Sequence, residues 1–211
     1  MTATIAAADA ARRTQAQRRE AAQRRLLDAA LACLVEDGYA GFTTLAVARR
    51  AAMSQGGLFR HFPSKSDLLA ATMGYLIDQH VEEWETRFLG LPPDQRTAEA
   101  GLQLLSWVTG DERIRAVFDL AAAARTDPQL RERLAPLMSS FMERTHALAH
   151  DILAQLMPVD SRFFNSAIDL ALSAMLGLTL IEIADGDLER RGRVVKLLQS
   201  DLAARLARGA G

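Results

Sequence analysis

The stretch from residue 54 to 62 combines residue types that can recognise nucleic acid. Gln55 can form a bidentate pair with adenine, and Arg60 can form one with guanine. Gly56 and Gly57 carry no side chain, so the backbone could approach a partner closely. Two glycines in one short helix each cost about 1 kcal/mol relative to alanine, so stability alone does not favour them. The residue types therefore predict a surface that reads base edges in DNA.

Two short helical patterns would position this stretch. Thr43 is a natural N-cap, and Leu45 and Val47 belong to an apolar face about two turns long. Ser54 can cap a second helix, and Pro63 ends it because the residue before a proline avoids the helical region. A helix, a short turn and a second helix form a helix-turn-helix, whose second helix enters the major groove.

A long helix is predicted to follow, from Ser64 to about Phe88. Ser64, with Asp67 three residues on, makes an acidic variant of the capping box. The exposed N–H groups at the start of this helix, together with Lys65, would hold a phosphate oxygen. Because its other end would lie in the second part of the chain, one rigid helix would connect the DNA-facing surface to whatever that part binds.

The sequence from Arg25 to Leu69 resembles the TetR family of bacterial transcriptional regulators. The residues that carry the resemblance are Phe42-Thr43-Thr44, Ala48, Ser54-Gln55-Gly56-Gly57-Leu58-Phe59 and His61-Phe62-Pro63-Ser64-Lys65. The last two runs look like the family's recognition helix and the start of its linking helix. The rest of the chain belongs to a part that varies within the family, for which the resemblance implies only helices.

The resemblance implies an all-α fold, in which an N-terminal three-helix helix-turn-helix domain is joined by a long helix to a helical-bundle domain for ligand binding and dimerisation. We expect a flexible arm at 1–16, a DNA-binding domain at 17–66 and an effector-binding and dimerisation domain at 67–211. The implied function is a sequence-specific repressor, released from a palindromic operator by a small-molecule effector. Its expected partners are the operator DNA, a second copy of the chain and an effector of unknown identity.

The expected DNA contacts lie on the motif and at the start of the long helix. They are Thr43, Thr44, Ser54, Gln55, Gly56, Gly57, Phe59, Arg60, His61 and Lys65. Arg60 could read a base or hold a phosphate, while Arg12 and Arg13 could reach a minor groove or form a solvated basic tail. The family usually has glycine where Ala52 stands. Ala52 would either take a left-handed conformation, at roughly 1–2 kcal/mol, or alter the turn.

Charge is divided unevenly along the chain. Residues 1–66 hold ten Lys and Arg against five Asp and Glu, whereas residues 67–211 hold fifteen against twenty-one. The basic excess at 1–66 suits a DNA-binding module, and the acidic excess at 67–211 suits a second part of the chain that is repelled by phosphate. The single Cys33 cannot form an internal disulfide, which fits a reducing cytoplasm. With no secretory signal and no uninterrupted apolar run of about 18 residues, a cytoplasmic protein without a membrane partner is expected.

Further helices are predicted at about 97–108, 112–125 and 128–156, then at 160–184 and after Gly186. The helix at 160–184 is apolar on nearly all sides, so its second face is expected to meet another subunit. Two such helix pairs related by a two-fold axis would form a four-helix bundle. The expected dimer contacts are Ile168, Ala171, Ala174, Gly177, Leu178, Ile181, Val195, Leu198 and Leu202.

Aromatic side chains and adaptable methionines in the middle of the chain favour either an effector pocket or plain core packing. The candidate pocket residues are Met73, Ile77, Trp107, Phe118, Met138, Phe141, Met142, His146 and Met175. His146 and His150 have the i, i+4 spacing of metal ligands, or they are hydrated surface histidines, since no third ligand is near in sequence.

No phosphate-binding loop, dinucleotide fingerprint or nucleophile elbow occurs in the sequence. We therefore expect no enzymatic activity, no cofactor and no metal. The alternatives are a constitutive DNA-binding factor without an effector, and a helical enzyme or metal-binding protein.

Overall fold

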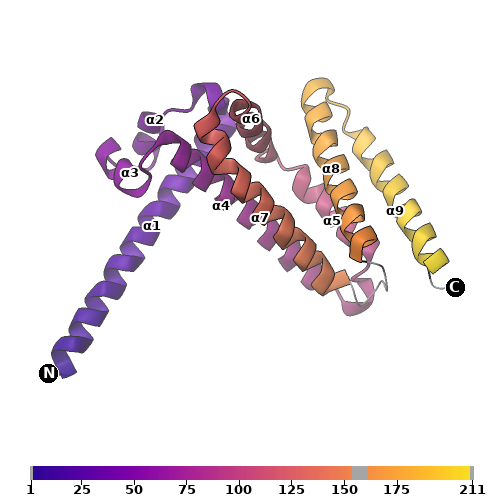
Figure 1. Ribbon diagram of the computed structural model, residues 1–211, viewed down its shortest axis with the longest axis horizontal. Coiled ribbons are helices and arrows are strands. Elements are labelled where there is room, and N and C mark those ends of the chain that lie inside the picture. Colours follow the sequence, from indigo (N-terminus) through magenta and orange to yellow (C-terminus); the bar gives the residue numbers. More distant parts are fainter. Residues whose placement is uncertain (1, 154–160, 210–211) are drawn as a thin grey trace.

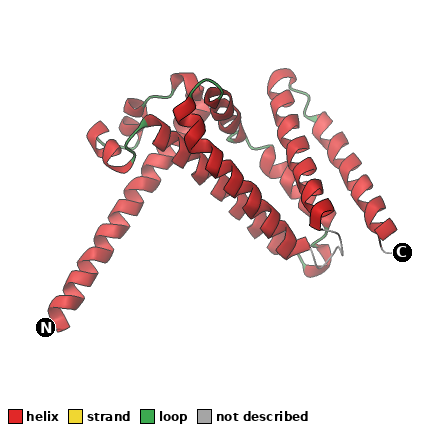
Figure 2. Ribbon diagram, in the orientation of Figure 1, coloured by secondary structure: helices red, strands yellow, loops and turns green. Residues whose placement is uncertain are grey.

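The computed structural model describes the backbone of residues 2–153 and 161–209, and the side chains of residues 15–151 and 164–201. Throughout the described backbone the chain is helical and contains no strand (Figures 1 and 2). The expected all-α fold is thus confirmed. The first helix, α1 (Thr2–Gly41), projects from the molecule at its N-terminal end (Figure 1).

The helix-turn-helix consists of α2 (Thr44–Arg50) and α3 (Gln55–His61). Both N-caps form as expected from the sequence. The hydroxyl of Thr43 accepts a hydrogen bond at 3.1 Å from the backbone N–H three residues on, and the hydroxyl of Ser54 does the same at 3.0 Å. Phe62 leaves the helical conformation and ends α3. Local capping therefore defines where both helices begin.

Two residues near this motif have φ angles in the left-handed region. Gly38, with φ 63°, interrupts the helical backbone near the end of α1. A Cβ atom on Gly38 would lie 3.2 Å from Oδ2 of Asp119, so this position needs glycine for its conformation and for space. Ala52 has φ 52°. The left-handed turn is therefore kept without glycine, and Ala52 bears a steric cost of roughly 1–2 kcal/mol.

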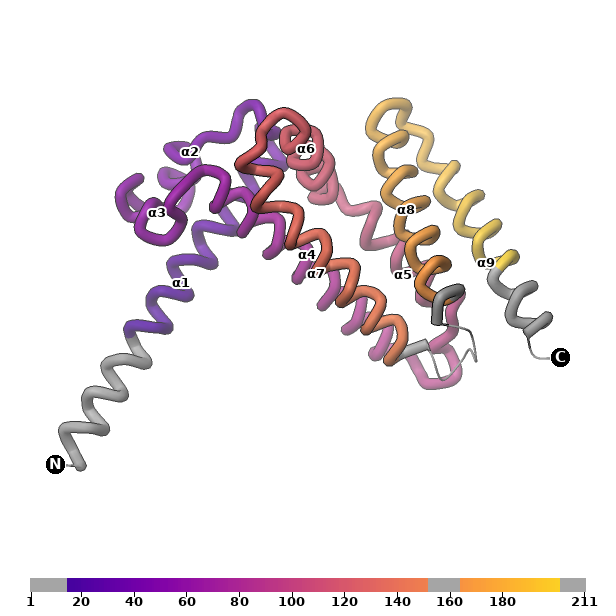
Figure 3. Tube along the Cα trace, viewed as in Figure 1, coloured from indigo at the N-terminus to yellow at the C-terminus, as the bar shows by residue number. Residues whose placement is uncertain are grey.

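The remaining helices build the rest of the molecule. Their bounds are α4 (Lys65–Leu89), the short 3-10 helix η1 (Pro93–Gln95), α5 (Ala98–Thr109), α6 (Ile114–Ala124), α7 (Pro128–Leu153), α8 (Ser161–Asp185) and α9 (Glu189–Gly209). The long helix α4 packs along α7, while α8 and α9 lie together at the far end from α3 (Figures 1 and 3). Helix α5 contacts α4, α8 and α9 and so joins the two ends.

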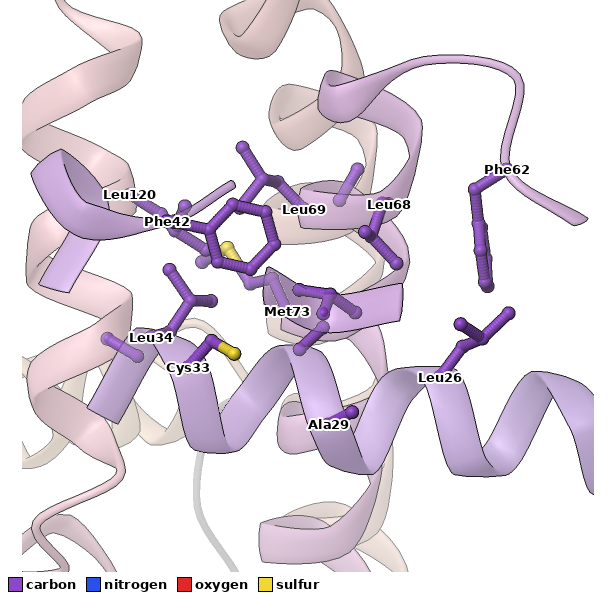
Figure 4. Packing of buried hydrophobic residues seen from close by; sticks show 14 of the residues in the cluster. Leu26, Ala29, Cys33, Leu34, Phe42, Phe62, Leu68, Leu69, Met73 and Leu120 are labelled. Atoms are coloured by element: carbon purple, nitrogen blue, oxygen red, sulfur yellow. The ribbon is translucent and has the colours of Figure 1, made fainter. Parts of the chain in front are cut away.

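The largest apolar core lies where α1 to α4 meet α6 and α7. Figure 4 shows part of it, with Phe42, Leu68 and Met73 packed against the α1 side chains Leu26 and Cys33. Side chains of α6 and α7 belong to the same buried cluster. The core therefore crosses the domain boundary predicted at 66/67. That boundary remains a prediction from the sequence.

The start of α1 differs from the sequence-based expectation. We expected a flexible arm over 1–16, but the first helix already begins at Thr2. Residues 3–11 are rich in alanine, the best helix former, and contain neither glycine nor proline to end the helix. The side chains of Arg12 and Arg13 lie outside the described residues, so their predicted DNA contact stays a prediction.

Helix α8 is unusually apolar. By length and composition alone, its segment Phe164–Asp185 could cross a membrane, although the sequence has no long uninterrupted apolar run. Core helices of soluble proteins pass the same test, but only 28% of the most apolar window is buried here. One side of α8 packs against α5, α6, α7 and α9. The other side leaves large apolar residues exposed.

Replacing Ala52 with glycine should stabilise the protein. Glycine adopts the left-handed conformation without the steric cost, while its greater freedom in the unfolded chain removes part of the gain. We expect a net increase of about 0.5–1 kcal/mol in the free energy of unfolding, measured by urea titration. Ala51→Gly is the matched control, because Ala51 has φ −75° and should be destabilised by glycine. A destabilised Ala52→Gly protein would contradict strain in this turn.

Candidate DNA-binding surface and internal cavity

Helix α3 has one buried side and one exposed side. Leu58 is completely buried and, with Phe62, anchors the helix on the core. The opposite side presents Gln55, Phe59 and Arg60 to solvent. Among the other predicted DNA contacts, Thr43, Ser54 and Gly56 are exposed and Thr44, Gly57, His61 and Lys65 are half-buried. The geometry is that of a helix whose outer face is free to enter a groove.

Gln55 is held in place by the neighbouring helix. Its Nε2 donates a hydrogen bond to Oγ1 of Thr44, with a distance of 3.1 Å. This bond restricts the Gln55 side chain before any DNA is bound, which lowers the entropy lost on binding. The Thr43 hydroxyl accepts the capping bond of α2, so its own O–H can still donate to a phosphate oxygen.

Lys65 lies at the first position of α4 among aromatic rings. Its Nζ is 4.8 Å from the ring centroid of Tyr39 and 5.5 Å from that of Phe42. These are cation–π distances, and such contacts stabilise an exposed site by about 0.5–1 kcal/mol. The rings keep a positive charge beside the free N–H groups of α4. Arg60, by contrast, forms no ion pair with any described residue, whereas Arg50 is paired with Glu36.

A partly open cavity of about 330 Å³ lies among the helices from α4 to α9. Its wall is mainly apolar. Representative lining residues are Leu76, Ile77 and Trp84 of α4, Leu105 of α5, Val117 of α6, Met138 and Phe141 of α7, Phe164 and Ala171 of α8, and Leu198 of α9. The volume lies at the small end of the range for ligand-binding pockets. The cavity can therefore hold a small, largely apolar molecule.

Two polar side chains on the cavity wall were not anticipated from the sequence. Nε2 of His80 and Oγ1 of Thr145 are buried and form no hydrogen bond within the described part of the chain. Burial lowers the pKa of His80, and the positive charge of Arg113 lowers it further, against the opposing effect of Asp111. His80 is consequently uncharged at neutral pH. The only sequence signal was a polar residue within an otherwise apolar helical stripe.

The predicted pocket residues divide into two groups. Three of them, Ile77, Met138 and Phe141, line the cavity, and six do not. Those six are Met73, Trp107, Phe118, Met142, His146 and Met175. Met73 and Met175 are buried in packed clusters instead. Trp107 is 47% exposed and lies under Arg87, whose guanidinium carbon is 3.8 Å from the ring centroid.

His146 and His150, which have the i, i+4 spacing of metal ligands, pair with residues of α8. His146 Nε2 is 2.7 Å from Oδ1 of Asp169, and His150 Nε2 is 3.1 Å from Oδ1 of Asn165. Within the described ranges, no group of three or more His, Cys, Asp and Glu side chains could hold a metal ion. Both histidines are half-buried, so they connect α7 to α8 rather than projecting into water.

The outward side of α8 and α9 carries most of the exposed apolar surface in this region. Its large members on the two helices are Leu170, Leu180, Ile181, Ile183 and Leu197, and Leu188 is exposed in the turn between the helices. Gly177 lies on α8 with no atom within 4 Å of the position that a Cβ would occupy. Of the predicted dimer contacts, Ile181 and Gly177 are thus available to a partner. Leu202 lies outside the described side chains.

Several other predicted dimer contacts point into the chain. Ala171, Leu178 and Val195 are only 7%, 6% and 3% exposed within one chain, so their contact with a second subunit stays a prediction. Ile168, Ala174 and Leu198 are half-buried and pack against clusters within the same chain. The cause is that a helix apolar on all sides gives no signal for which face turns inward.

Comparison with known proteins identifies the family. A model of bacterial regulatory proteins of the tetR family matches residues 26–72. The regulator CymR of Pseudomonas putida, an HTH-type transcriptional regulator, is 32% identical over 186 residues, which cover 87% of this chain and 90% of CymR. The chain belongs to the TetR family. An HTH-type transcriptional regulator of Mycobacterium tuberculosis is 34% identical over 137 residues, covering 65% of this TetR-family chain and 70% of the relative.

Solved structures agree with this TetR-family fold. A TetR-family transcriptional regulator from Mesorhizobium loti has a TM-score of 0.65 at 19% identity, covering 90% of this chain and 97% of that protein. FadR from Bacillus subtilis, solved in complex with stearoyl-CoA, has a TM-score of 0.61 at 17% identity, covering 83% and 96%. By sequence, the repressor KstR of Mycolicibacterium smegmatis is also similar, with 43% identity over 61 residues, which cover 29% of each chain. The protein is a TetR-like transcriptional regulator.

Substitutions at Gln55 and Lys65 should separate base reading from phosphate binding. Gln55→Ala should weaken binding to the operator by about 1–3 kcal/mol and reduce the preference for operator over scrambled DNA. Lys65→Ala should weaken binding to both DNAs alike and reduce the salt slope by about one unit. Salt titrations by fluorescence anisotropy measure both effects, with Lys65→Arg as the charge-retaining control. Unchanged specificity in Gln55→Ala would exclude base reading by this side chain.

Acid should destabilise the protein through His80. The folded pKa lies below the unfolded value of 6.5, so the unfolded chain takes up this proton first as the pH falls. The free energy of unfolding should therefore decrease from about pH 6.5 downward, at up to about 1.4 kcal/mol per pH unit for this one group. The control is His80→Gln, in which this contribution should be lost. Equal pH dependence of both proteins in urea titrations would contradict the neutral buried imidazole.

Proposed function

We propose that this TetR-family regulator is a homodimeric repressor, released from a palindromic operator by a small molecule that enters the cavity. The course of α4 is the observation that carries this proposal. The helix begins beside α3 at Lys65, and farther along it supplies Leu76, His80 and Trp84 to the cavity wall. The same rigid element is thus in contact with the DNA-facing module and with the site of the small molecule.

Recognition of the operator rests on the exposed side of α3. Gln55 and Arg60 are the proposed readers of base edges, and Thr43, Thr44 and Lys65 the proposed phosphate contacts. Each subunit would place α3 in the major groove of one half-site. The two-fold symmetry then demands half-sites about one helical turn, roughly 34–36 Å, or a multiple of it apart. Binding to chromosomal DNA would place the protein in the cytoplasm.

The outward side of α8 and α9 is the proposed dimer interface. Without a partner, its exposed leucines and isoleucines would remain in contact with water. Burying them gains about 25 cal/mol of free energy for each Å² of apolar surface. Open space around Gly177 and Gly192 would allow backbones of two copies to approach closely. A two-fold pairing of α8 and α9 with the same helices of a second copy would bury this surface.

Coupling between cavity and DNA would pass through α4 and α6. In α6, Val117 lines the cavity, whereas the neighbouring Leu120 belongs to the core shared with α1. Asp119 accepts a hydrogen bond from the backbone N–H of Tyr39, at 3.4 Å, where α1 leads into the motif. A molecule that displaces α4 or α6 would change the angle of α3, with a coupling free energy of typically 1–3 kcal/mol.

The alternatives lead to different behaviour. A constitutive factor without an effector would bind its operator equally with and without any occupant of the cavity. A helical enzyme would require a constellation of reactive groups, and the cavity wall is mainly apolar. FadR, of the same fold, was solved with stearoyl-CoA bound, which supports a ligand-responsive repressor over both alternatives.

Gly177→Arg should split the dimer and abolish tight operator binding together. The new side chain meets no atom of its own chain within 4 Å of the Cβ, so the subunit should fold normally. Loss of the second half-site should weaken operator binding on the order of 10²–10⁴-fold. Light scattering at micromolar concentration reports the oligomeric state, and anisotropy with DNA footprinted beside the protein's own gene reports binding.

Ala147→Arg is the matched control, since Ala147 is exposed on α7, away from the proposed interface. This variant should remain dimeric and bind the operator like the unmodified protein. A dimeric Gly177→Arg protein with normal operator affinity would place the subunit interface elsewhere. A monomeric unmodified protein would contradict the homodimer itself.

A further inference from the structure

The cavity contains two unpaired polar atoms that lie level with each other along α4 and α7. The two helices run in the same direction, since Asp67 pairs with Arg133 and, farther along, Asp78 pairs with Arg144. The same spacing brings His80, two residues beyond Asp78, level with the turn of α7 that contains Thr145. Both side chains line the same cavity, so their polar atoms are available to one bound molecule.

Neither atom finds a partner within the described chain. His80 is only 6% exposed, and its Nε2 is 3.7 Å from Oδ2 of Asp111, which is beyond hydrogen-bond distance. Oγ1 of Thr145 is likewise buried without a hydrogen bond among the described residues. Buried polar atoms in native proteins are nearly always paired, so an unpaired couple in one cavity needs an explanation. A polar group on a bound molecule would supply the missing bonds.

The electrostatics of the cavity disfavour an ion as that group. Among the described lining residues there is no lysine or arginine to neutralise an anion. Arg113, whose positive charge acts on His80, is already paired with Asp111 and Glu83. The carboxylate on the wall, Asp201, has an interaction of its own and so is not available to a cation without loss. Desolvating a charge without a new partner is costly.

A hydroxyl group fits both side chains. A neutral imidazole has one donor and one acceptor nitrogen, and a threonine hydroxyl can both donate and accept. An alcohol or phenol can therefore bridge His80 and Thr145 whichever imidazole nitrogen carries the hydrogen. Most of the remaining wall, with Trp84, Phe141 and Phe164, offers apolar contact to the rest of the molecule. The other polar residues on the wall, Thr109, Ser166 and Asp201, have interactions of their own.

We propose that the cavity selects a neutral, mainly apolar molecule with one hydroxyl group, which bridges His80 Nε2 and Thr145 Oγ1. The inference deepens the proposed function, because it rests on this cavity being the effector site. Among molecules that share the same apolar part, it predicts that a neutral alcohol binds more tightly than a charged analogue. It also predicts that two residues, one on α4 and one on α7, share the polar recognition.

The test uses 1-octanol, octanoate and octylammonium, which share one alkyl chain and differ in charge. Their binding to the DNA-free protein is measured by calorimetry and by the emission of Trp84 in a Trp107→Phe background, where Trp84 is the only tryptophan. We expect 1-octanol to bind at least about tenfold more tightly than either ion, since each ion would be desolvated without a partner. Equal or tighter binding of an ion, or no binding of 1-octanol, would overturn the proposal.

Thr145→Val and His80→Leu test the anchoring. Each variant should bind 1-octanol about three- to tenfold more weakly while its weak binding of octanoate stays unchanged. Circular dichroism and urea unfolding establish that each variant is folded. Unchanged 1-octanol affinity in both folded variants would show that the two side chains do not hold the hydroxyl, and so would overturn the bridge.

Operator binding is measured separately in the presence of each compound. Selective 1-octanol binding that leaves operator affinity unchanged would contradict the effector role while leaving the cavity chemistry intact. Operator release without selectivity for 1-octanol would contradict the cavity chemistry while leaving the effector role intact. The two proposals can thus fail independently.

Discussion

Helix α4 is packed into two environments at once, and this double packing governs the rest of the molecule. Its first half contributes Leu68, Leu69 and Met73 to the core that positions α1, α2 and α3. Its second half forms a wall of the cavity with His80 and Trp84. Because a close-packed interior transmits displacement rather than absorbing it, a change at the cavity would reach the helix-turn-helix. No hinge of loop residues interrupts α4 between the two environments.

A buried ion pair joins α8 and α9, at the end of the molecule away from the helix-turn-helix. Arg191 of α9 is 2.7 Å from Glu182 of α8, and both side chains are largely buried. The same guanidinium donates to the carbonyl of Ser106 and to Oγ1 of Thr109, both on α5, at 3.0 Å. A buried pair with its remaining hydrogen bonds satisfied specifies geometry more than it adds stability. It fixes the orientation of α8 and α9 relative to the cavity.

The DNA-binding module could be predicted closely because its signals are local. Thr43, Ser54 and Ser64 each cap a helix within three residues, and Pro63 follows directly on the end of α3, so short sequence patterns determine these boundaries. For Ala52 two outcomes were open, a left-handed conformation or an altered turn, and the residue adopts the left-handed one. Only the N-terminal start of α1 was misjudged, because alanine-rich sequence is compatible with either a helix or a mobile arm.

The cavity could not be predicted in the same way, since its walls come from six helices far apart in sequence. Met73 and Met175 have the same residue type as Met138, yet only Met138 faces the cavity. Helical periodicity identifies an apolar side, but it does not tell whether that side meets a neighbour or an empty volume. His80 and Thr145 were missed for the related reason that a lone polar residue acquires significance only from its surroundings.

Helix α8 shows how one apolar helix can serve two surfaces. Its composition would suit a membrane, yet Glu182 and Asp169 within the same segment pair with Arg191 and His146, which dock it into the helical bundle. Ala171 and Leu172 face the cavity, while Leu180 and Ile181 are exposed on the side proposed to meet a second copy. A molecule that shifts the cavity wall would therefore also shift the proposed subunit interface. Under this arrangement the spacing of two recognition helices depends on both ends of the bundle, through α4 within each subunit and through α8 between subunits.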